Sequence, residues 1–151
     1  MTNLRKFAAG DWGAVREIEK DSFLDGRPRP LEKYLREHPK EFIVAENEKK
    51  IVGYIAGRIK HDSSATIAFL AVTPAFRRRG IGQKLSAYLI SHFKRKGMKE
   101  ILVCARVNNE PSISLYRKLG FEIVKKIEGY YRNGDDAFVM KKYLDKMAED
   151  E

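Results

Sequence analysis

The chain has 151 residues, of which 43% are hydrophobic and 34% are charged, and its formal net charge is +9. Its one cysteine excludes an intrachain disulfide, and no apolar run has the length of a signal core or of a membrane span. These values predict a cytoplasmic protein with one domain over residues 1–144, followed by an acidic, frayed tail over residues 145–151.

The first half of the chain predicts short strands and two helices, bounded by turn residues. Asp11 is a candidate N-cap for the first helix, and a loop with two prolines and a glycine follows that helix. The expected strands occupy residues 4–7, 42–46, 51–60 and 66–72. The expected helices occupy residues 12–23 and 31–37.

The second half alternates helix and strand. A helix begins near Ile81, its apolar residues recur at helical spacing, and Gly97 ends it. The remaining expected elements are a strand over residues 101–107, a helix over 111–119, and strands over 122–127 and 137–143. Strands followed by alternating helix and strand predict an α/β (α+β) fold, with a mixed sheet flanked by helices.

The most informative stretch joins the strand over residues 66–72 to the helix that begins near Ile81. It contains three consecutive arginines, Arg77 to Arg79, and two glycines, Gly80 and Gly82. Glycine lets a ligand approach the backbone closely, and a helix start has unpaired N–H groups and a partial positive charge. The stretch therefore predicts an anion site for a phosphate or pyrophosphate. A solvated basic patch or a nucleic-acid contact is the alternative, whereas neither the Walker loop nor the dinucleotide fingerprint matches the spacing.

The positive charge is concentrated around this stretch. From Ser63 to Lys99 there is no Asp or Glu, and eight Lys or Arg residues lie in that window. Such a field attracts an anionic ligand. Nucleic acid would be attracted as well, so charge alone does not choose between the two kinds of ligand.

Two segments resemble a known family. Residues 77–82, Arg-x-x-Gly-x-Gly, precede an amphipathic helix and are similar to the acetyl-CoA-binding signature of the GNAT acetyltransferases. In residues 109–121 an Asn is followed by Leu-Tyr-x-x-x-Gly-Phe, which resembles a second segment of that family. The two segments have the expected order and separation, and the resemblance extends from about residue 4 to residue 143.

The resemblance implies a sheet of about seven strands, in which the two central strands, residues 66–72 and 101–107, part at their ends. It implies acetyl-CoA as the cosubstrate, no metal, and direct attack of a primary amine on the thioester. The cofactor-binding residues that it implies are Leu70, Ala71, Val72, Arg77, Arg78, Arg79, Gly80, Ile81, Gly82, Gln83, Asn109, Ser112 and Tyr116.

The same resemblance assigns two catalytic tasks. Tyr116 is the acid that protonates the leaving thiolate, and a free amide near Ala71 or Val72 polarises the thioester oxygen. Without the resemblance, Tyr116 would be a core aromatic residue of its helix, and Asn109 would be an N-cap.

A further resemblance narrows the family. Residues 129–141 are similar to the end of the protein N-terminal acetyltransferases, the branch with ribosomal-protein-alanine and archaeal enzymes. There a Tyr-Tyr pair and an Asp-Ala-x-x-Met strand border the first residues of the peptide, which makes Tyr130, Tyr131 and Asp136 candidates for acceptor binding. Asp25 is another candidate, because the loop at residues 24–30 corresponds to a region that borders the acceptor site. A partly buried aromatic pair and solvated loop charges are the alternatives.

One position departs from the pattern of the ribosomal-protein branch. Cys104 stands where that branch has a glutamate that is proposed as the base. A cysteine in a strand is usually a small, inert core residue. Glu19, Asp25, His61 or ordered water would then have to accept the proton of the amine.

The chain is thus expected to be an acetyl-CoA-dependent N-acetyltransferase that acts on the α-amine of protein N-termini. Transfer to a small amine or a lysine side chain is one alternative, and a non-catalytic nucleic-acid-binding or adaptor module on the same fold is another. Nucleic acid is less favoured, because no recognition-helix or base-stacking signature is present. The expected partners are acetyl-CoA and the acceptor, without a membrane, and the sequence leaves open a monomer or a homodimer.

Overall fold

The computed structural model describes residues 2–22, 31–60 and 63–144. Asp25, His61 and the tail over residues 145–151 lie outside these ranges, so what the sequence predicts for them stays a prediction. The chain divides into two compact units, one formed by Met1–Arg58 with Ile67–Leu89 and the other by Ile59–Thr66 with Ile90–Glu151.

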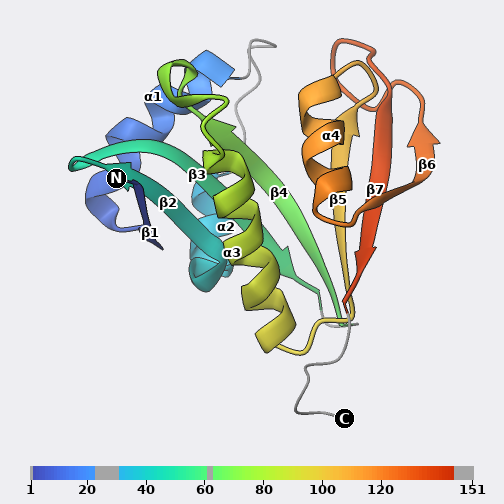
Figure 1. Ribbon diagram of the computed structural model, residues 1–151, viewed down its shortest axis with the longest axis horizontal. Coiled ribbons are helices and arrows are strands. Elements are labelled where there is room, and N and C mark those ends of the chain that lie inside the picture. Colours follow the sequence, from blue (N-terminus) through green and yellow to red (C-terminus); the bar gives the residue numbers. More distant parts are fainter. Residues whose placement is uncertain (1, 23–30, 61–62, 145–151) are drawn as a thin grey trace. The chain divides into compact units, whose positions relative to one another are not determined.

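The strands of the described residues form one seven-stranded sheet (Figure 1). They are β1 (Thr2–Lys6), β2 (Phe42–Asn47), β3 (Lys50–Ile59), β4 (Ser64–Val72), β5 (Glu100–Arg106), β6 (Glu122–Ile127) and β7 (Ala137–Tyr143). Their order in the sheet is β1-β2-β3-β4-β5-β7-β6. This arrangement confirms the predicted mixed sheet, and every predicted strand is present within two residues of its expected bounds.

The helices also match the predicted pattern. The described α-helices are α1 (Trp12–Ser22), α2 (Leu31–Glu37), α3 (Ile81–Arg95) and α4 (Glu110–Lys118), and the short 3-10 helices are η1 (Ala9–Asp11), η2 (Pro39–Glu41) and η3 (Pro74–Phe76). Gly97 and Gly120 follow the ends of α3 and α4 with φ of 83° and 95°, which is the left-handed conformation of a helix stop. Within the described part of the chain, no helix combines the length and the apolar character needed to cross a membrane.

In the first unit, helices cover both faces of the sheet (Figure 1). Alternation along the strands sends Val44 and Tyr54 into a core with Val15 and Ile18 of α1. Gly53, which precedes Tyr54 in β3, points to the opposite face and towards α3, because a Cβ added to it would lie 3.3 Å from Cδ1 of Leu85. A larger side chain at that position would therefore push α3 away from the strands.

In the second unit, β7 pairs antiparallel with β5 on one side and with β6 on the other. Val103 lies opposite Met140 in this register, and both are buried together with Ile113 and Tyr116 of α4. Because the side chains of a strand alternate, Cys104 and Arg106 lie on the other face of β5. From that face Cys104 and Arg106 contact the loop between β6 and β7.

The structure corrects the predicted start of α1. Asp11 ends η1, and its carboxylate accepts a hydrogen bond from the backbone N–H of Ala8 at 2.8 Å and a bidentate pair from Arg5 at 2.8 and 2.9 Å. It is therefore not the N-cap of α1. A guanidinium is a stronger partner for a carboxylate than a backbone N–H is. The Asp11 side chain therefore points towards Arg5 of β1 and not towards the first N–H groups of α1.

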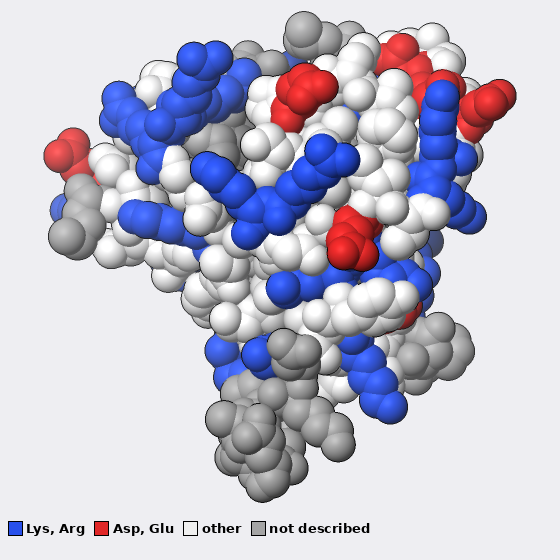
Figure 2. Space-filling view, turned by 45° about the vertical axis from the view of Figure 1, so that its right-hand side comes forward, with Lys and Arg blue, Asp and Glu red and all other residues white. Residues whose placement is uncertain are grey.

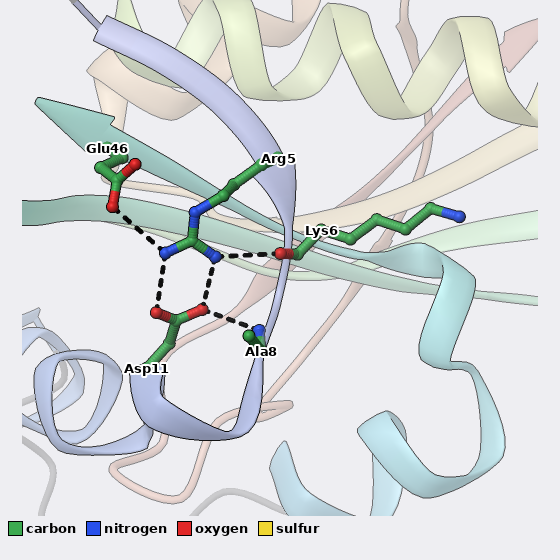
Figure 3. Close-up of polar contacts among 5 residues, drawn as sticks. All are labelled: Arg5, Lys6, Ala8, Asp11 and Glu46. Carbon is green, nitrogen blue, oxygen red and sulfur yellow. Dashed lines mark hydrogen bonds and ion pairs between the residues drawn. The ribbon is translucent and has the colours of Figure 1, made fainter. Parts of the chain in front are cut away.

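Arg5 connects three segments of the first unit (Figure 3). Besides Asp11 of η1, its guanidinium contacts Oε2 of Glu46 in β2 at 3.3 Å, and it donates to the carbonyl of Lys6 at 3.1 Å. The hydrogen bond from Arg5 lowers the pKa of Asp11, which is buried. The ion pair therefore stabilises the folded state when Asp11 is ionised.

We predict that Asp11→Asn lowers the free energy of unfolding by about 1–2 kcal/mol at pH 7, a figure reduced for the partial exposure of Arg5. Since the folded pKa of Asp11 lies below its unfolded value of about 3.9, the contribution is present above that value and is lost as pH falls through the folded pKa. Urea denaturation at pH 7 and pH 3 measures both effects. Glu46→Gln is the control with a smaller expected loss, and an Asp11→Asn difference that does not shrink in acid would contradict the assignment.

Candidate active site

The turn between β4 and α3 has an unusual backbone. Arg78 and Gly80 both have positive φ, 64° and 80°. The carbonyl of Gly80 accepts the first hydrogen bond of α3, from the N–H of Lys84 at 3.0 Å. The N–H groups of Ile81, Gly82 and Gln83 lie in the first helical turn, where they have no partner within the helix. Such N–H groups and the positive end of the helix dipole suit an anion, so this geometry is compatible with the predicted phosphate site, which stays a prediction.

Two of the arginines in this turn contact the turn itself. Nε of Arg77 donates to the carbonyl of Val72 at 2.9 Å, at the end of β4. The guanidinium of Arg79 lies 4.7 Å from the centre of the Phe76 ring in η3. Arg77, Arg78 and Arg79 are all exposed. The turn is therefore ordered by its own side chains and still presents positive charge to solvent.

The predicted residues upstream of the turn are the last residues of β4. Ala71 is buried, whereas Leu70 and Val72 are half-buried. Pro74 begins η3, which confirms that the strand ends before the proline. The first unit thus brings all predicted residues from Leu70 to Gln83 into one strand–turn–helix segment.

Basic side chains are widespread on the surface. Figure 2 shows one face, on which Lys and Arg are spread over much of the surface with a few Asp and Glu between them. This distribution fits the net charge of +9 and favours anionic ligands in general.

The start of α4 in the second unit holds the next group of predicted residues. Oδ1 of Asn109 accepts the N–H of Ser112 at 3.2 Å, so Asn109 is the N-cap of this helix. One turn further on, the Tyr116 ring is 4% exposed and packs edge to face on Phe121, with ring centres 5.4 Å apart. Both residues therefore have structural roles, which leaves the chemical roles of Asn109 and Tyr116 as proposals.

The loop between β6 and β7, residues 128–136, holds the acceptor candidates Tyr130, Tyr131 and Asp136. The two tyrosine rings meet edge to face at 5.1 Å, and Tyr130 is 49% exposed. Oδ1 of Asp136 accepts the N–H of Gly129 at 2.8 Å, and Oδ2 lies 3.5 Å from Nζ of Lys126. Asp136 therefore closes the base of the loop, while the tyrosines present ring and hydroxyl surface.

Cys104 differs from its expected environment. It is exposed, on the face of β5 opposite to that of the buried Val103, and is not a core residue. Packing around the strand raises the pKa of its thiol, whereas a hydrogen bond with Tyr130 and the charge of Lys125 oppose that rise to a smaller extent. The thiol is therefore protonated at neutral pH and does not replace a glutamate base.

The structure shows two sets of contacts near predicted site residues that the sequence did not predict. Arg106, at the end of β5, reaches the loop at residues 128–136 through hydrogen bonds and a ring contact. The sequence could have suggested a role for Arg106, because it follows Cys104 by two residues and therefore lies on the same face of the strand. In the first unit, the buried hydroxyl of Tyr54 is hydrogen-bonded to Glu19, which is one of the candidate bases.

The chain is similar to known acetyltransferases in sequence and in fold. The model of the acetyltransferase (GNAT) family covers residues 12–121. An N-alpha-acetyltransferase of Sulfurisphaera tokodaii is 35% identical over 119 residues, which are 71% of this chain and 71% of the relative. Ard1 from Thermoplasma volcanium has a TM-score of 0.89 and 26% identity, over 96% of this chain and 99% of that structure. Arabidopsis thaliana Naa50, solved in complex with a bisubstrate analogue, has a TM-score of 0.83 and 26% identity, over 95% of this chain and 99% of that structure.

The match of the family model covers more than half of the chain, and the archaeal relative is similar over more than two thirds of its own length. The two signatures that carried the resemblance lie at the start of α3 and along α4, the helix that Asn109 caps. The chain therefore belongs to the acetyltransferase (GNAT) family, which confirms the predicted acetyl-CoA-dependent acyltransferase.

Proposed function

We propose that this protein transfers the acetyl group of acetyl-CoA to the α-amine of protein N-termini. The observation that carries the proposal is the similarity to an N-alpha-acetyltransferase over most of the chain. The bisubstrate analogue in the Naa50 structure, which joins CoA to a peptide, supports the same pair of substrates. A cytoplasmic location, a single domain over residues 1–144 and the choice between monomer and homodimer stay predictions.

The β4–α3 turn is assigned to the phosphates of the coenzyme. The amides from Arg78 to Gly82 bind the pyrophosphate, and the exposed arginines add positive charge around it. The end of β4 is assigned to the thioester, whose oxygen an amide near Ala71 or Val72 polarises. Asn109 and Ser112, at the start of α4, are assigned to the cofactor as well, as the sequence predicts.

The reaction is a direct transfer. The neutral amine attacks the thioester carbon, a C–N bond forms, and the C–S bond breaks. The departing thiolate takes a proton from the Tyr116 hydroxyl, and the new amide loses its extra proton to a base or to water. Tyr130, Tyr131 and Asp25 are assigned to the acceptor peptide, and Asp136 supports the loop that holds the two tyrosines.

We predict that Gly82→Val lowers acetyl-CoA affinity at least about tenfold, because a side chain in the first turn of α3 blocks close approach of phosphate to the amides. Isothermal titration calorimetry measures the affinity. Ala87→Val places the same side chain on an exposed position of the same helix and should bind as the parent does. Unchanged affinity of Gly82→Val would place the phosphates elsewhere, and salt-sensitive nucleic-acid binding that acetyl-CoA does not displace would favour the adaptor alternative.

We predict that Tyr116→Phe lowers kcat by about 10²–10⁴-fold, the usual effect of a lost general acid, with little change in acetyl-CoA affinity. The substitution keeps the ring that packs on Phe121, so folding should be preserved. Single-turnover kinetics separates the chemical step from product release. Unchanged turnover with a rate-limiting chemical step would return Tyr116 to the role of a core aromatic residue.

We predict faster acetylation of α-amines than of lysine side chains at pH 7. Only a neutral amine attacks, and a peptide α-amine with a pKa of about 7.7–8.0 is neutral in roughly a tenth of molecules. A lysine with a pKa of about 10.4 is neutral in well under a thousandth. Since the Cys104 thiol is itself protonated, nothing at that position removes the difference.

The comparison uses one peptide with a free N-terminus and blocked lysines, and its counterpart with a blocked N-terminus and one free lysine. The rate with the lysine peptide should rise about tenfold per pH unit between pH 7 and 9, whereas the rate with the α-amine levels off near its own pKa. Faster acetylation of the lysine peptide at pH 7 would overturn the proposal and indicate a dedicated base. A small-amine panel in the same assay tests the remaining enzyme alternative.

A further inference from the structure

We propose that Arg106 is a positioning residue that holds the acceptor loop, residues 128–136, in the conformation that receives the peptide. The inference rests on the proposed function, because it assigns Arg106 a role in recognition of the acceptor. It concerns residues of the second unit alone, and it depends on contacts made by one guanidinium.

Arg106 contacts three residues of the acceptor loop. Its Nη1 lies 3.0 Å from Oδ1 of Asn133 and 3.0 Å from Oδ2 of Asp135. Its guanidinium carbon lies 3.9 Å from the centre of the Tyr131 ring. A planar guanidinium can place its face on an aromatic ring while its edge donates hydrogen bonds, which an ammonium group cannot do.

The tip of the loop is a small network that includes this guanidinium. The N–H of Tyr131 donates to the carbonyl of Asp135 at 3.1 Å, and the N–H of Gly134 donates to the carbonyl of Tyr131 at 2.9 Å. The Asn133 side chain bridges to both the N–H and the carboxylate of Asp135, each at 3.1 Å. The Asp135 carboxylate is partly buried, so loss of its cation would favour opening of the turn that carries Tyr131.

The backbone of Arg106 is fixed by the same unit. The residue ends β5, in register with Ala137 of β7, and its carbonyl accepts the N–H of Asn109 at 3.0 Å. Asn109 in turn caps α4, the helix of Tyr116. Arg106 thus joins the acceptor loop through its side chain to the start of the proposed catalytic helix through its backbone.

This arrangement predicts an effect on the acceptor rather than on the cofactor. Arg106→Met keeps much of the length of the side chain but removes the charge, the donors and the planar group. The KM for the N-terminal peptide should rise at least about tenfold, while the KM for acetyl-CoA stays within about twofold. Arg106→Lys retains a charge near Asp135 but loses the planar group, so its peptide KM should lie between those of the parent and Arg106→Met.

Arg117→Met is the matched control, because Arg117 is an exposed arginine of the same unit and loses the same charge. Its two KM values should equal those of the parent. A double variant, Arg106→Met with Tyr131→Leu, should have a peptide KM no higher than the worse of the two single variants, because Arg106 acts through Tyr131. Full additivity of the two effects would overturn this route of action.

Hydrogen–deuterium exchange over residues 128–136 tests the loop without any assay of activity. The amides of Tyr131 and Gly134, which are hydrogen-bonded in the parent, should exchange at least about tenfold faster in Arg106→Met and at the parent rate in Arg117→Met. Unchanged exchange together with an unchanged peptide KM would overturn the inference. A fall in kcat and in melting temperature with both KM values unchanged would also overturn it, because it would indicate a purely structural role. If the parent acetylates no peptide at all, the proposed function fails, and the exchange result still decides whether Arg106 orders the loop.

Discussion

The left-handed backbone at Arg78 and Gly80 is the constraint on which the proposed phosphate-binding turn depends. It turns the chain from the end of β4 into the first turn of α3 within a few residues, so that consecutive amides are available to one anion. Glycine adopts this conformation without strain, but Arg78 is held there at a cost of roughly 1–3 kcal/mol. The contacts of Arg77 with Val72 and of Arg79 with Phe76 flank Arg78 and help to fix that conformation.

The proposed acceptor loop, residues 128–136, is ordered in a different way. Charged groups fix it at both ends: Asp136 with Gly129 and Lys126 at the base, and Arg106 with Asp135 at the tip. Polar contacts of this kind specify a conformation without filling a core. Tyr130 and Tyr131 remain at least partly exposed in this loop, as their proposed contact with a peptide requires.

Local sequence signals predicted the elements of this fold, but the partners of charged side chains depend on long-range pairing. The spacing of apolar residues gave the helices and strands. Gly97 was correctly identified as a helix end, and Asn109 has the N-cap role that was its alternative, because caps are decided within a few residues. Asp11 was wrongly assigned as a helix cap, because the local sequence does not reveal that its carboxylate pairs with Arg5 of β1. Arg106 was not assigned, because the loop that it contacts lies more than twenty residues further on.

The environment of Cys104 connects the fold to the choice of substrate. Its strand position is fixed by pairing with Val139, which exposes the side chain on the face that holds Arg106 and Tyr130. A raised pKa leaves a neutral thiol there, so this face offers hydrogen bonds and ring surface but no anion at Cys104 to deprotonate an ammonium group. An acceptor that is already partly neutral at physiological pH needs no such anion. At the position where the ribosomal-protein branch has its proposed base there is thus no carboxylate, which favours an α-amine as the acceptor.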